Sequence, residues 1–272
     1  MKAFEVGLVV PTRNSQGTIE ACLLSLRRQS VPCLIVVVDN HSTDGTRRIA
    51  SRLADQVLLR GPERSAQRNA GAAALGCQVV GFIDSDMVLD TGVAEEAAAL
   101  VRGGAGVVIV PERSQGKGFW SAVRSYERSF YLGQDQVEAA RFFDHDVFDR
   151  LGGFDTGLDA GEDWDLTIRA REVSEVARTI SGITHNEGYL HFFAACAKKA
   201  SYSPGIQAFA SKHGLHALLA ALDRPYFRRP CSLLGRHPIL GAGVLALKAG
   251  EAAAVGWRLL RASAQSRSTS RA

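Results

Sequence analysis

Two carboxylates that follow an apolar run near residue 80 could bind a divalent cation. Phe82 and Ile83 are followed by Asp84, Ser85 and Asp86, so one residue separates the two acids at the end of an expected strand. Hard divalent cations take oxygen ligands and are commonly shared with the phosphates of a substrate. A solvated turn at a strand end has the same pattern, so the Asp-x-Asp motif alone leaves both interpretations open.

Three further polar clusters also lie at or beyond the ends of apolar runs. Asp39 could accept a hydrogen bond from a nucleobase N–H or a ribose hydroxyl, although Asp44-Gly45 just beyond it also suits a plain turn. The segment 11–14 has exposed backbone groups that could hold the edge of a base. Arg64 and Arg68 lie i,i+4 on one helical face, where they could neutralise a phosphate or remain solvated.

Short β-branched runs alternate with helical patterns over the first 110 residues. The expected strands are Phe4–Val10, Leu34–Asp39, Gln56–Leu59, Val79–Ile83 and Gly106–Val110, and the expected helices are Thr18–Gln29, Thr43–Ala54, Ser65–Leu75 and Gly92–Val101. Runs such as Val36-Val37-Val38 are typical of parallel strands covered on both faces. This repetition predicts an open, mostly parallel α/β sheet with flanking helices. Such sheets bind ligands beyond the carboxyl ends of their strands, and each of the four clusters is expected to lie at such an end.

The rest of the chain is less regular and then helical. Helices are predicted over Phe119–Leu132 and from Gly161 to about Val173, with a loop at 151–155 between them. From residue 188 the composition is helical, with breaks at 203–205 and around 224–238. The last residues, 263–272, mix Ser with Arg and predict a disordered tail.

The charge of the chain is unevenly distributed. Lys and Arg number 32 against 28 Asp and Glu, and the net charge of +4 is too small to indicate a nucleic-acid partner. Residues 1–197 hold 20 basic and 26 acidic residues, whereas residues 198–272 hold 12 basic residues and only Asp223 and Glu251 as acids. This asymmetry predicts an anionic partner for the C-terminal quarter.

Several classes of protein are disfavoured by the sequence. The five cysteines are odd in number and lack CxxC spacing, which indicates reduced thiols and a cytosolic chain. The first residues read as a strand and not as a signal peptide. There is no P-loop, Gly-x-Ser-x-Gly elbow or HExxH motif, and the glycines at 103–106 precede a strand with no following helix, so they are not a dinucleotide fingerprint.

Taken together, the motifs resemble those of the family 2 glycosyltransferases of the GT-A fold. Over residues 4–200 they occur in the family's order: VVPTRN, VVVDNHSTDGT, RSAQRNAG, FIDSDM, LGGFD and GEDWDL. The resemblance implies a GT-A-like catalytic domain at 1–200. It also implies an inverting glycosyltransferase that moves a sugar from a nucleotide-diphosphate donor, with a UDP-sugar expected first, to a hydroxyl acceptor. GDP- and dTDP-sugars are compatible with the same residues.

The resemblance also implies a role for individual residues. The implied donor-binding residues are Pro11, Thr12, Asn14, Asp39, Arg68, Asp84 and Ser85. The implied ligands of Mn²⁺ or Mg²⁺ are Asp86, Asp84 and His185, and the implied general base is Asp163, with Glu162 and Asp165 as alternatives. The implied contacts to an acceptor or phosphate are Glu162, Trp164, Lys198, Lys199 and Tyr202.

Each of these roles has a structural alternative. A helix N-terminus favours acids through its dipole, which would explain Glu162 and Asp163 without catalysis. His185 could be a structural histidine, Trp164 a core residue, and Lys198 and Lys199 part of a solvated face.

The basic C-terminal part, 201–262, is predicted to be helical and to associate with a membrane. Its apolar stretch 239–260 is interrupted by Lys248, Glu251 and Arg258, so a clean transmembrane span is not expected. Arginines and aromatics in 222–262 suit the surface of an anionic bilayer. The alternative is a helical hairpin packed on the catalytic domain or on a second subunit. The first interpretation predicts a polyprenyl-linked or other membrane glycan as acceptor, in cell-envelope glycan biosynthesis, and a cytoplasmic enzyme peripheral to the inner face of the plasma membrane.

Two other functions compete with glycosyl transfer. A sugar-nucleotide nucleotidyltransferase has a similar sheet, but it would carry a Gly-rich signature with a basic residue after the first strand, which the segment 11–14 lacks. A non-catalytic protein that binds nucleotide-sugars or lipids at a membrane is the other alternative. The intact Asp84, Asp86 and Asp163 argue against it.

Overall fold

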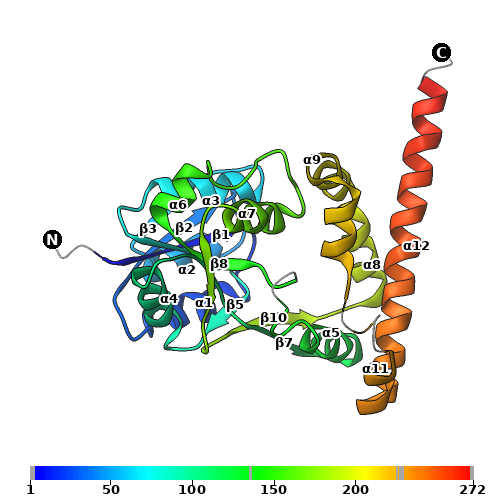
Figure 1. Ribbon diagram of the computed structural model, residues 1–272, viewed down its shortest axis with the longest axis horizontal. Helices are drawn as coiled ribbons and strands as arrows, with labels where there is room; N and C mark the ends of the chain where they lie inside the picture. The colour runs from blue at the N-terminus through cyan, green and yellow to red at the C-terminus, as the bar shows by residue number, and fades with distance from the viewer. Residues whose placement is uncertain (1–3, 135–136, 225, 227–229, 270–272) are drawn as a thin grey trace. The chain divides into compact units, whose positions relative to one another are not determined.

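The protein folds into two units. The computed structural model describes residues 4–134, 137–224, 226 and 230–269. The first unit comprises Met1–Arg113 and Leu132–Asn186, and the second comprises Ser114–Tyr131 and Glu187–Ala272 (Figure 1). The division therefore lies earlier in the chain than the expected boundary after residue 200.

A seven-stranded, mostly parallel sheet forms the centre of the first unit. Its strands, in sheet order, are β3 (Gln56–Leu59), β2 (Cys33–Asp39), β1 (Val6–Thr12), β4 (Val79–Phe82), β8 (Ala140–Asp144), β6 (Ala105–Ile109) and β9 (Glu175–Arg178). Only β8 is antiparallel to its neighbours among the strand pairs described. The predicted α/β class is confirmed, and the predicted strands are shifted at their ends by no more than two residues.

Helices cover both faces of this sheet, as Figure 1 shows. One face packs against α1 (Ile19–Arg27), α2 (Thr46–Leu53) and α4 (Val93–Arg102). The other packs against α3 (Arg64–Ala73), α6 (His145–Arg150) and α7 (Glu162–Arg171). The strands are apolar at successive residues because each face has its own core: Leu8 and Val10 belong to one, and Val9 to the other.

A glycine brings α3 close to the sheet. A Cβ at Gly71 would lie 2.3 Å from Cγ1 of Val9 in β1, far inside van der Waals contact. Without that side chain the helix backbone can approach the strand closely. Arg68 of α3 can thereby reach Asp84, just beyond the end of β4.

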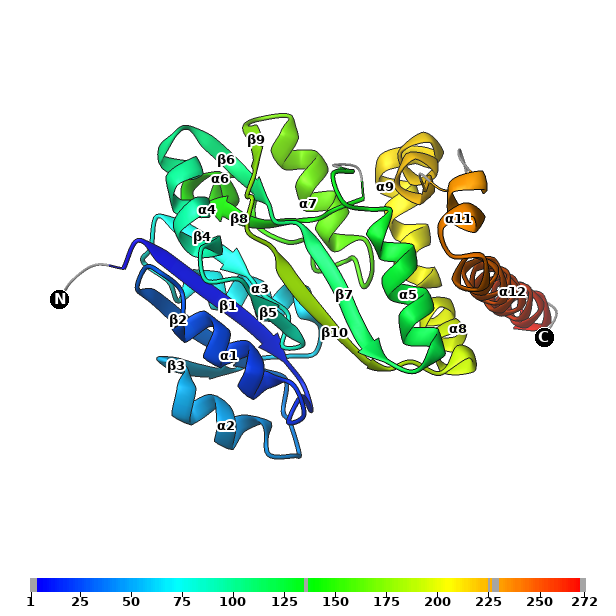
Figure 2. The same ribbon diagram turned by 90° about the horizontal axis from the view of Figure 1, so that it is seen from below.

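A second sheet has the order β5-β10-β7 (Figure 2). Its strands are β5 (Met87–Leu89), β10 (Ile183–Tyr189) and β7 (Glu112–Lys117), and His185 of β10 lies opposite Met87 of β5. Neither this sheet nor β8, α6 and β9 is predicted from the sequence. The reason is clearest for β7, whose residues ERSQGK are polar and largely exposed, so that strand pairing and not local pattern defines it.

The second unit is helical and has its own core. Its helices are α5 (Phe119–Ser129), α8 (Phe192–Ser201), α9 (Ser203–Leu222), α11 (Pro230–Arg236) and α12 (Pro238–Thr269). Val123 of α5, Ala195 of α8 and Val244 of α12 are among the residues of one buried apolar cluster. This shared core explains why the second unit includes α5 and begins before residue 201.

The last helix is longer than the sequence predicts. Helix α12 continues to Thr269, into the segment 263–272 for which the sequence predicts a disordered tail, and positions 270–272 lie outside the described residues. The helix continues because no glycine or proline follows Gly256, and Ala, Arg and Gln are good helix formers. Within α12, Pro238–Arg261 is long and apolar enough to cross a membrane by length and composition.

Candidate functional site

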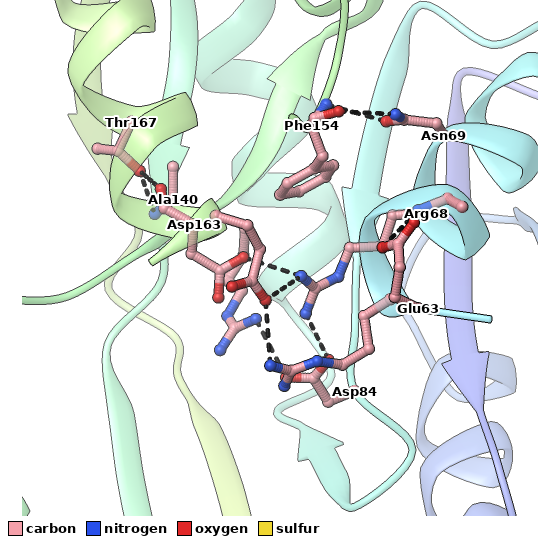
Figure 3. A network of polar contacts seen from close by, with 12 residues as sticks. Glu63, Arg68, Asn69, Asp84, Ala140, Phe154, Asp163 and Thr167 are labelled. Carbon is pink, nitrogen blue, oxygen red and sulfur yellow. Dashed lines mark hydrogen bonds and ion pairs between the residues drawn. The ribbon is translucent and has the colours of Figure 1, made fainter. Parts of the chain in front are cut away.

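Arg68 is the centre of a buried ionic cluster that joins three of the sequence motifs. Its side chain is 1% exposed. Nη2 donates to Oδ1 of Asp84 at 2.8 Å, while Nη1 donates to Oε1 of Glu162 at 3.1 Å and to Oδ1 of Asp163 at 3.0 Å (Figure 3). The guanidinium thus connects the end of β4 with the first turn of α7. The structure thus brings residues of the RSAQRNAG, FIDSDM and GEDWDL motifs together.

The charges of this cluster stabilise one another. Burial would lower the pKa of Arg68, but Asp163, Asp84 and Glu162 outweigh it and raise this pKa further, so the guanidinium stays charged. Burial would likewise raise the pKa of Asp84, but Arg68, Arg141 and Arg64 hold it well below its usual range. For Glu162, burial and then the neighbouring Asp163 prevail over the arginines and raise the pKa.

A second buried arginine, Arg141 of β8, was not singled out from the sequence. Its Nη1 lies 3.4 Å from Oδ2 of Asp84, and its Nε donates to Oε1 of Glu112 at 2.6 Å. Asp84 is therefore held from both oxygens, by Arg68 on one and Arg141 on the other. A charged residue inside the apolar run Ala140–Phe143 was the available signal, because a buried arginine needs an acidic partner.

The loop 151–154 is fixed to the cluster by side chains from two helices. Asn69 of α3 donates to the carbonyl oxygen of Phe154 at 2.8 Å and accepts from its N–H at 2.9 Å. The Phe154 ring then lies under the guanidinium carbon of Arg68, 5.0 Å from its centroid. Arg169 of α7 donates to the carbonyl oxygens of Leu151 and Gly153. The predicted loop is thus held by these hydrogen bonds next to Arg68.

The predicted base-binding residues lie at the ends of β1 and β2. Thr12 pairs in register with Asp39, and Gln67 of α3 donates to the Thr12 carbonyl oxygen at 3.1 Å. Asp39 is buried and accepts from the N–H of Ser42 at 2.9 Å and from its hydroxyl. Oγ1 of Thr12 is buried and has no hydrogen-bond partner within the part of the chain that the structure describes, so this strand end offers a polar atom to a ligand.

Two loops come together at the same edge. Asn14 has a positive φ of 50°, a conformation that asparagine tolerates better than most residues. Its N–H donates to Oγ of Ser42 at 2.8 Å, and its side-chain oxygen accepts from the N–H of Thr43 at 2.9 Å. Pro11 lies within β1 and not in a loop as expected, since the strand continues to Thr12.

Asp86 and His185 form the candidate metal-binding pair. Oδ2 of Asp86 lies 3.0 Å from Nε2 of His185, because β10 runs beside the turn that carries Asp86. Ser85 between the two aspartates donates to Oγ of Ser15 at 2.8 Å. Among the residues that the structure describes, no three His, Cys, Asp or Glu side chains form a group able to hold a metal. The carboxylate of Asp84, the third predicted metal ligand, is paired with Arg68 and Arg141.

The remaining predicted contacts are divided between the units. Trp164 is half-buried in α7, next to Asp163 in the chain. Lys198 and Lys199 lie in α8, and Tyr202 follows it, so all three belong to the second unit. Burial, and then Lys248, lower the pKa of Lys199. Their predicted contact with an acceptor or phosphate stays a prediction.

Comparison with solved structures shows what the fold resembles. The chain aligns with Staphylococcus aureus TarS 1–349 in complex with UDP-GlcNAc at 16% identity and a TM-score of 0.59, covering 96% of this chain and 92% of that one. It aligns with a mannosyltransferase from Pyrobaculum calidifontis, in complex with GDP-Man and Mn²⁺, at 18% identity and a TM-score of 0.61, covering 92% and 88%. It spans 45% of a longer TarS chain, at a TM-score of 0.55.

Sequence comparison gives the family. No curated protein matches the chain. A family model described as glycosyl transferase family 2 matches residues 8–155, which is more than half of the chain and includes Arg68, Asp84 and Asp86. Together with the mixed sheet of the GT-A glycosyltransferases, this match shows that the chain belongs to glycosyl transferase family 2.

Proposed function

We propose that the protein is an inverting glycosyltransferase that moves a sugar from a nucleoside-diphosphate donor to an acceptor hydroxyl. The observation that carries the proposal is the Arg68 cluster. One buried guanidinium binds both Asp84 of the Asp-x-Asp motif and Asp163, two carboxylates 79 positions apart in the chain. Inversion requires a base on the face of the sugar opposite the leaving group, so donor-side and acceptor-side carboxylates must be different residues held in one site.

Exposure favours Asp163 as the base within the first turn of α7. Its side chain is 27% exposed, whereas that of Glu162 is 5% exposed and that of Asp165 is 0% exposed. Asp165 also accepts from two nitrogens of Arg169, at 2.9 and 2.7 Å. A general base must reach the proton that it removes. Asp163 would therefore accept the acceptor's hydroxyl proton, while Arg68 keeps its carboxylate in place.

The donor is proposed to be a UDP-sugar bound across the ends of β1 and β2. Asp39 would accept from the base or ribose, and the unpartnered hydroxyl of Thr12 would gain a hydrogen bond. Pro11 and Asn14 would flank the base. The relatives of similar fold support a nucleotide-sugar: one is in complex with UDP-GlcNAc and another with GDP-Man.

A divalent cation is proposed to bind Asp86 and His185. Two ligands about 2.1 Å from one octahedral ion lie about 3 Å apart, which is the separation of these two side chains. The mannosyltransferase of similar fold is in complex with Mn²⁺. When bound, the ion would neutralise charge that develops on the leaving diphosphate. Asp84 is proposed to act mainly by orienting Arg68 and Arg141.

A donor panel tests this function. The purified chain would be incubated with UDP-, GDP- and dTDP-sugars, with and without Mn²⁺, and release of the nucleoside diphosphate would be measured. We expect turnover with UDP-sugars that falls about 10²–10⁴-fold in the Asp163→Asn variant, the range for loss of a general base. Nucleotide binding without turnover, unchanged by this substitution, would support the non-catalytic alternative instead.

The acceptor is proposed to be a polyprenyl-linked or other membrane-borne glycan. The proposal rests on the second unit, which contains the whole basic C-terminal quarter, 198–272. It implies a cytoplasmic enzyme attached to the inner face of the plasma membrane through 222–262. Flotation of the full chain with anionic vesicles tests the attachment, and a protein that stays entirely in the soluble fraction would contradict it.

A further inference from the structure

On helix α12 the charged residues face the protein and the apolar residues face outward, which is the opposite of the arrangement expected for a helix at a water-facing surface. Lys248 and Glu251 interrupt its apolar stretch and, in a soluble protein, would be expected to face solvent. Instead Glu251 is buried and Lys248 is half-buried, and both are turned towards α5. The side of α12 that points away from α5 is apolar.

The inward charges form a closed network. Glu127 of α5 is fully buried, and its carboxylate lies 2.6 Å from Nζ of Lys248 and 2.8 Å from Nη1 of Arg124. Glu251 pairs with Lys248 at 2.7 Å and also with Arg124. Each cation therefore lies between two carboxylates. These four residues hold α12 on α5.

The outward side carries apolar residues at helical spacing. The exposed apolar positions on this side are Ile239, Ala242, Leu245, Ala246, Ala249, Ala252, Ala253, Trp257 and Leu260. Trp257 is 61% exposed and Leu260 is 69% exposed. Among the exposed residues that the structure describes between Pro238 and Trp257, none is charged. We call this the outer face of α12.

Cationic residues lie near both ends of the outer face. Arg236 precedes the helix, and Arg258 and Arg261 lie on either side of Leu260, the last of the apolar positions. The guanidinium of Arg261 lies over the Trp257 ring, 4.9 Å from its centroid. Arginine and tryptophan are residues that favour the boundary between lipid head groups and acyl chains. The surrounding segment, 198–272, carries 12 basic and 2 acidic residues, which complements an anionic lipid surface.

We infer that α12 lies in the plane of an anionic bilayer, with its outer face in the lipid and its charged face on α5. The inference rests on the proposed membrane association and identifies the outer face of α12 as the surface that contacts the membrane. By this inference α12 lies on the membrane and does not cross it. The stretch Pro238–Arg261 is about 36 Å long at 1.5 Å per residue, enough to cross a hydrocarbon core of about 30 Å.

Packing within the second unit opposes such a crossing. A Cβ at Gly243 would lie 2.5 Å from Val123 of α5, and one at Gly250 would lie 2.6 Å from Phe192 of α8. The helix is therefore in tight contact with two others along one side. To span, α12 would have to leave α5 and carry Lys248 and Glu251 into hydrocarbon without Arg124 and Glu127, which is costly.

A second copy of the chain is a less suitable occupant of the outer face. It would bring another strongly basic segment against the first, and like charges oppose such an association. An anionic lipid surface offers both the apolar phase for Leu245 and Trp257 and the negative charge for the flanking arginines.

Vesicle flotation with matched variants tests the inference. Full-length protein would be floated with vesicles of phosphatidylglycerol and phosphatidylcholine. The test variant is Leu245→Gln/Leu260→Gln on the outer face. The control is Leu215→Gln/Leu219→Gln on α9, where both leucines are also well exposed. We expect partitioning of the test variant to fall about tenfold or more, because two buried leucines contribute strongly to partitioning, and that of the control to stay unchanged. Unchanged melting temperatures would show that both variants fold.

Each other outcome counts against the inference or against its premise. If the wild-type chain does not float, the proposed membrane association fails. If the wild type floats and the test variant floats equally well, or if the α9 control is lost as well, the assignment to the outer face of α12 is wrong. Retention of the wild type in membranes at pH 11 would indicate a spanning helix. A lipid-free dimer that the test variant dissociates would indicate a second copy of the chain.

Discussion

At the scale of single residues, Arg68 connects the carboxylates of the candidate site. Its guanidinium is nearly inaccessible to water and contacts three carboxylates from two distant parts of the chain. Removal of one partner from a buried ionic cluster leaves the others uncompensated. The same residue can therefore be needed both for the fold and for placing Asp163 and Asp84.

Substitution of Arg68 should lower stability more than substitution of its exposed neighbour Arg64. Arg68→Met is expected to lower the free energy of unfolding by about 3–5 kcal/mol, because it leaves buried acids without a partner. Arg64→Lys is the control, since its side chain is 47% exposed and pairs with Glu162 at 3.3 Å; it should change stability by no more than about 1 kcal/mol. Urea unfolding measures both. Equal losses would mean that Arg68 has no special role.

The Asp86–His185 pair should control the response to metal. In Asp86→Ala and His185→Ala variants, Mn²⁺ is expected to stop increasing the affinity for UDP, because the ion loses one of its two proposed protein ligands. Isothermal titration of UDP with Mn²⁺ or with EDTA measures this. Cys231→Ala, a change at an exposed thiol in the second unit, should behave as the wild type. An undiminished effect of Mn²⁺ in both variants would exclude this pair as the metal site.

At the scale of elements, α3 determines the geometry of the site. The close approach at Gly71 seats it on β1, Gln67 and Arg68 point to the strand ends, and Asn69 holds the loop before α7. One helix therefore positions groups that come from β1, β4 and α7. A change in α3 should act on activity through these contacts even where it touches no reacting atom.

Asn69→Ala tests this positioning. The substitution leaves the Phe154 N–H and carbonyl without partners and should cost about 1–3 kcal/mol of stability and also lower donor turnover. The control is Gln29→Ala, which removes comparable bonds to the backbone between α1 and α4. It should lower stability without a comparable loss of turnover per folded molecule. Equal turnover of the two variants would contradict a positioning role.

The network between α5 and α12 should make stability depend on acid. Burial would raise the pKa of Glu127, but Arg124 and Lys248 prevail and lower it from 4.5 to about 2. A carboxylate with a lowered folded-state pKa stabilises the fold above its unfolded pKa and loses this effect as the pH falls through the folded value. Stabilisation of about 3 kcal/mol should therefore disappear between about pH 4.5 and pH 2.

Glu127→Gln isolates this contribution. The variant should be less stable than the wild type at pH 7, and its free energy of unfolding should fall less steeply between pH 5 and pH 3. Glu20→Gln, at an exposed acid of α1, should keep the wild-type pH dependence. Urea unfolding at several pH values measures the slopes, and parallel curves for Glu127→Gln and the wild type would refute the assignment.

At the scale of the whole molecule, the acidic site residues and the basic C-terminal quarter lie in different units. The acidic residues of the site belong to the first unit, and the whole basic C-terminal quarter, 198–272, belongs to the second. A donor that binds the native first unit must stabilise it, since ligand binding shifts the unfolding equilibrium. UDP with Mn²⁺ at 100 times its dissociation constant should add about 2.7 kcal/mol. Thermal unfolding with UDP, GDP and dTDP measures this. If none of the three nucleotides raised the unfolding temperature, a nucleotide-diphosphate donor would be contradicted.

The sequence by itself determined the alternation of strands and helices, the parallel sheet and the motifs of the family. These features depend on neighbours in the chain, which fix apolar periodicity and strand-end chemistry. The tertiary structure decided which charges meet. Arg68 and Asp163 are separated by 95 positions, and Glu127 and Lys248 by 121. Such pairs, like the polar strand β7, have no local signal, because only folding removes them from water and makes the choice of partner decisive. For Arg141 the sequence shows a charge inside an apolar run, but only the tertiary structure shows that its partners are Asp84 and Glu112.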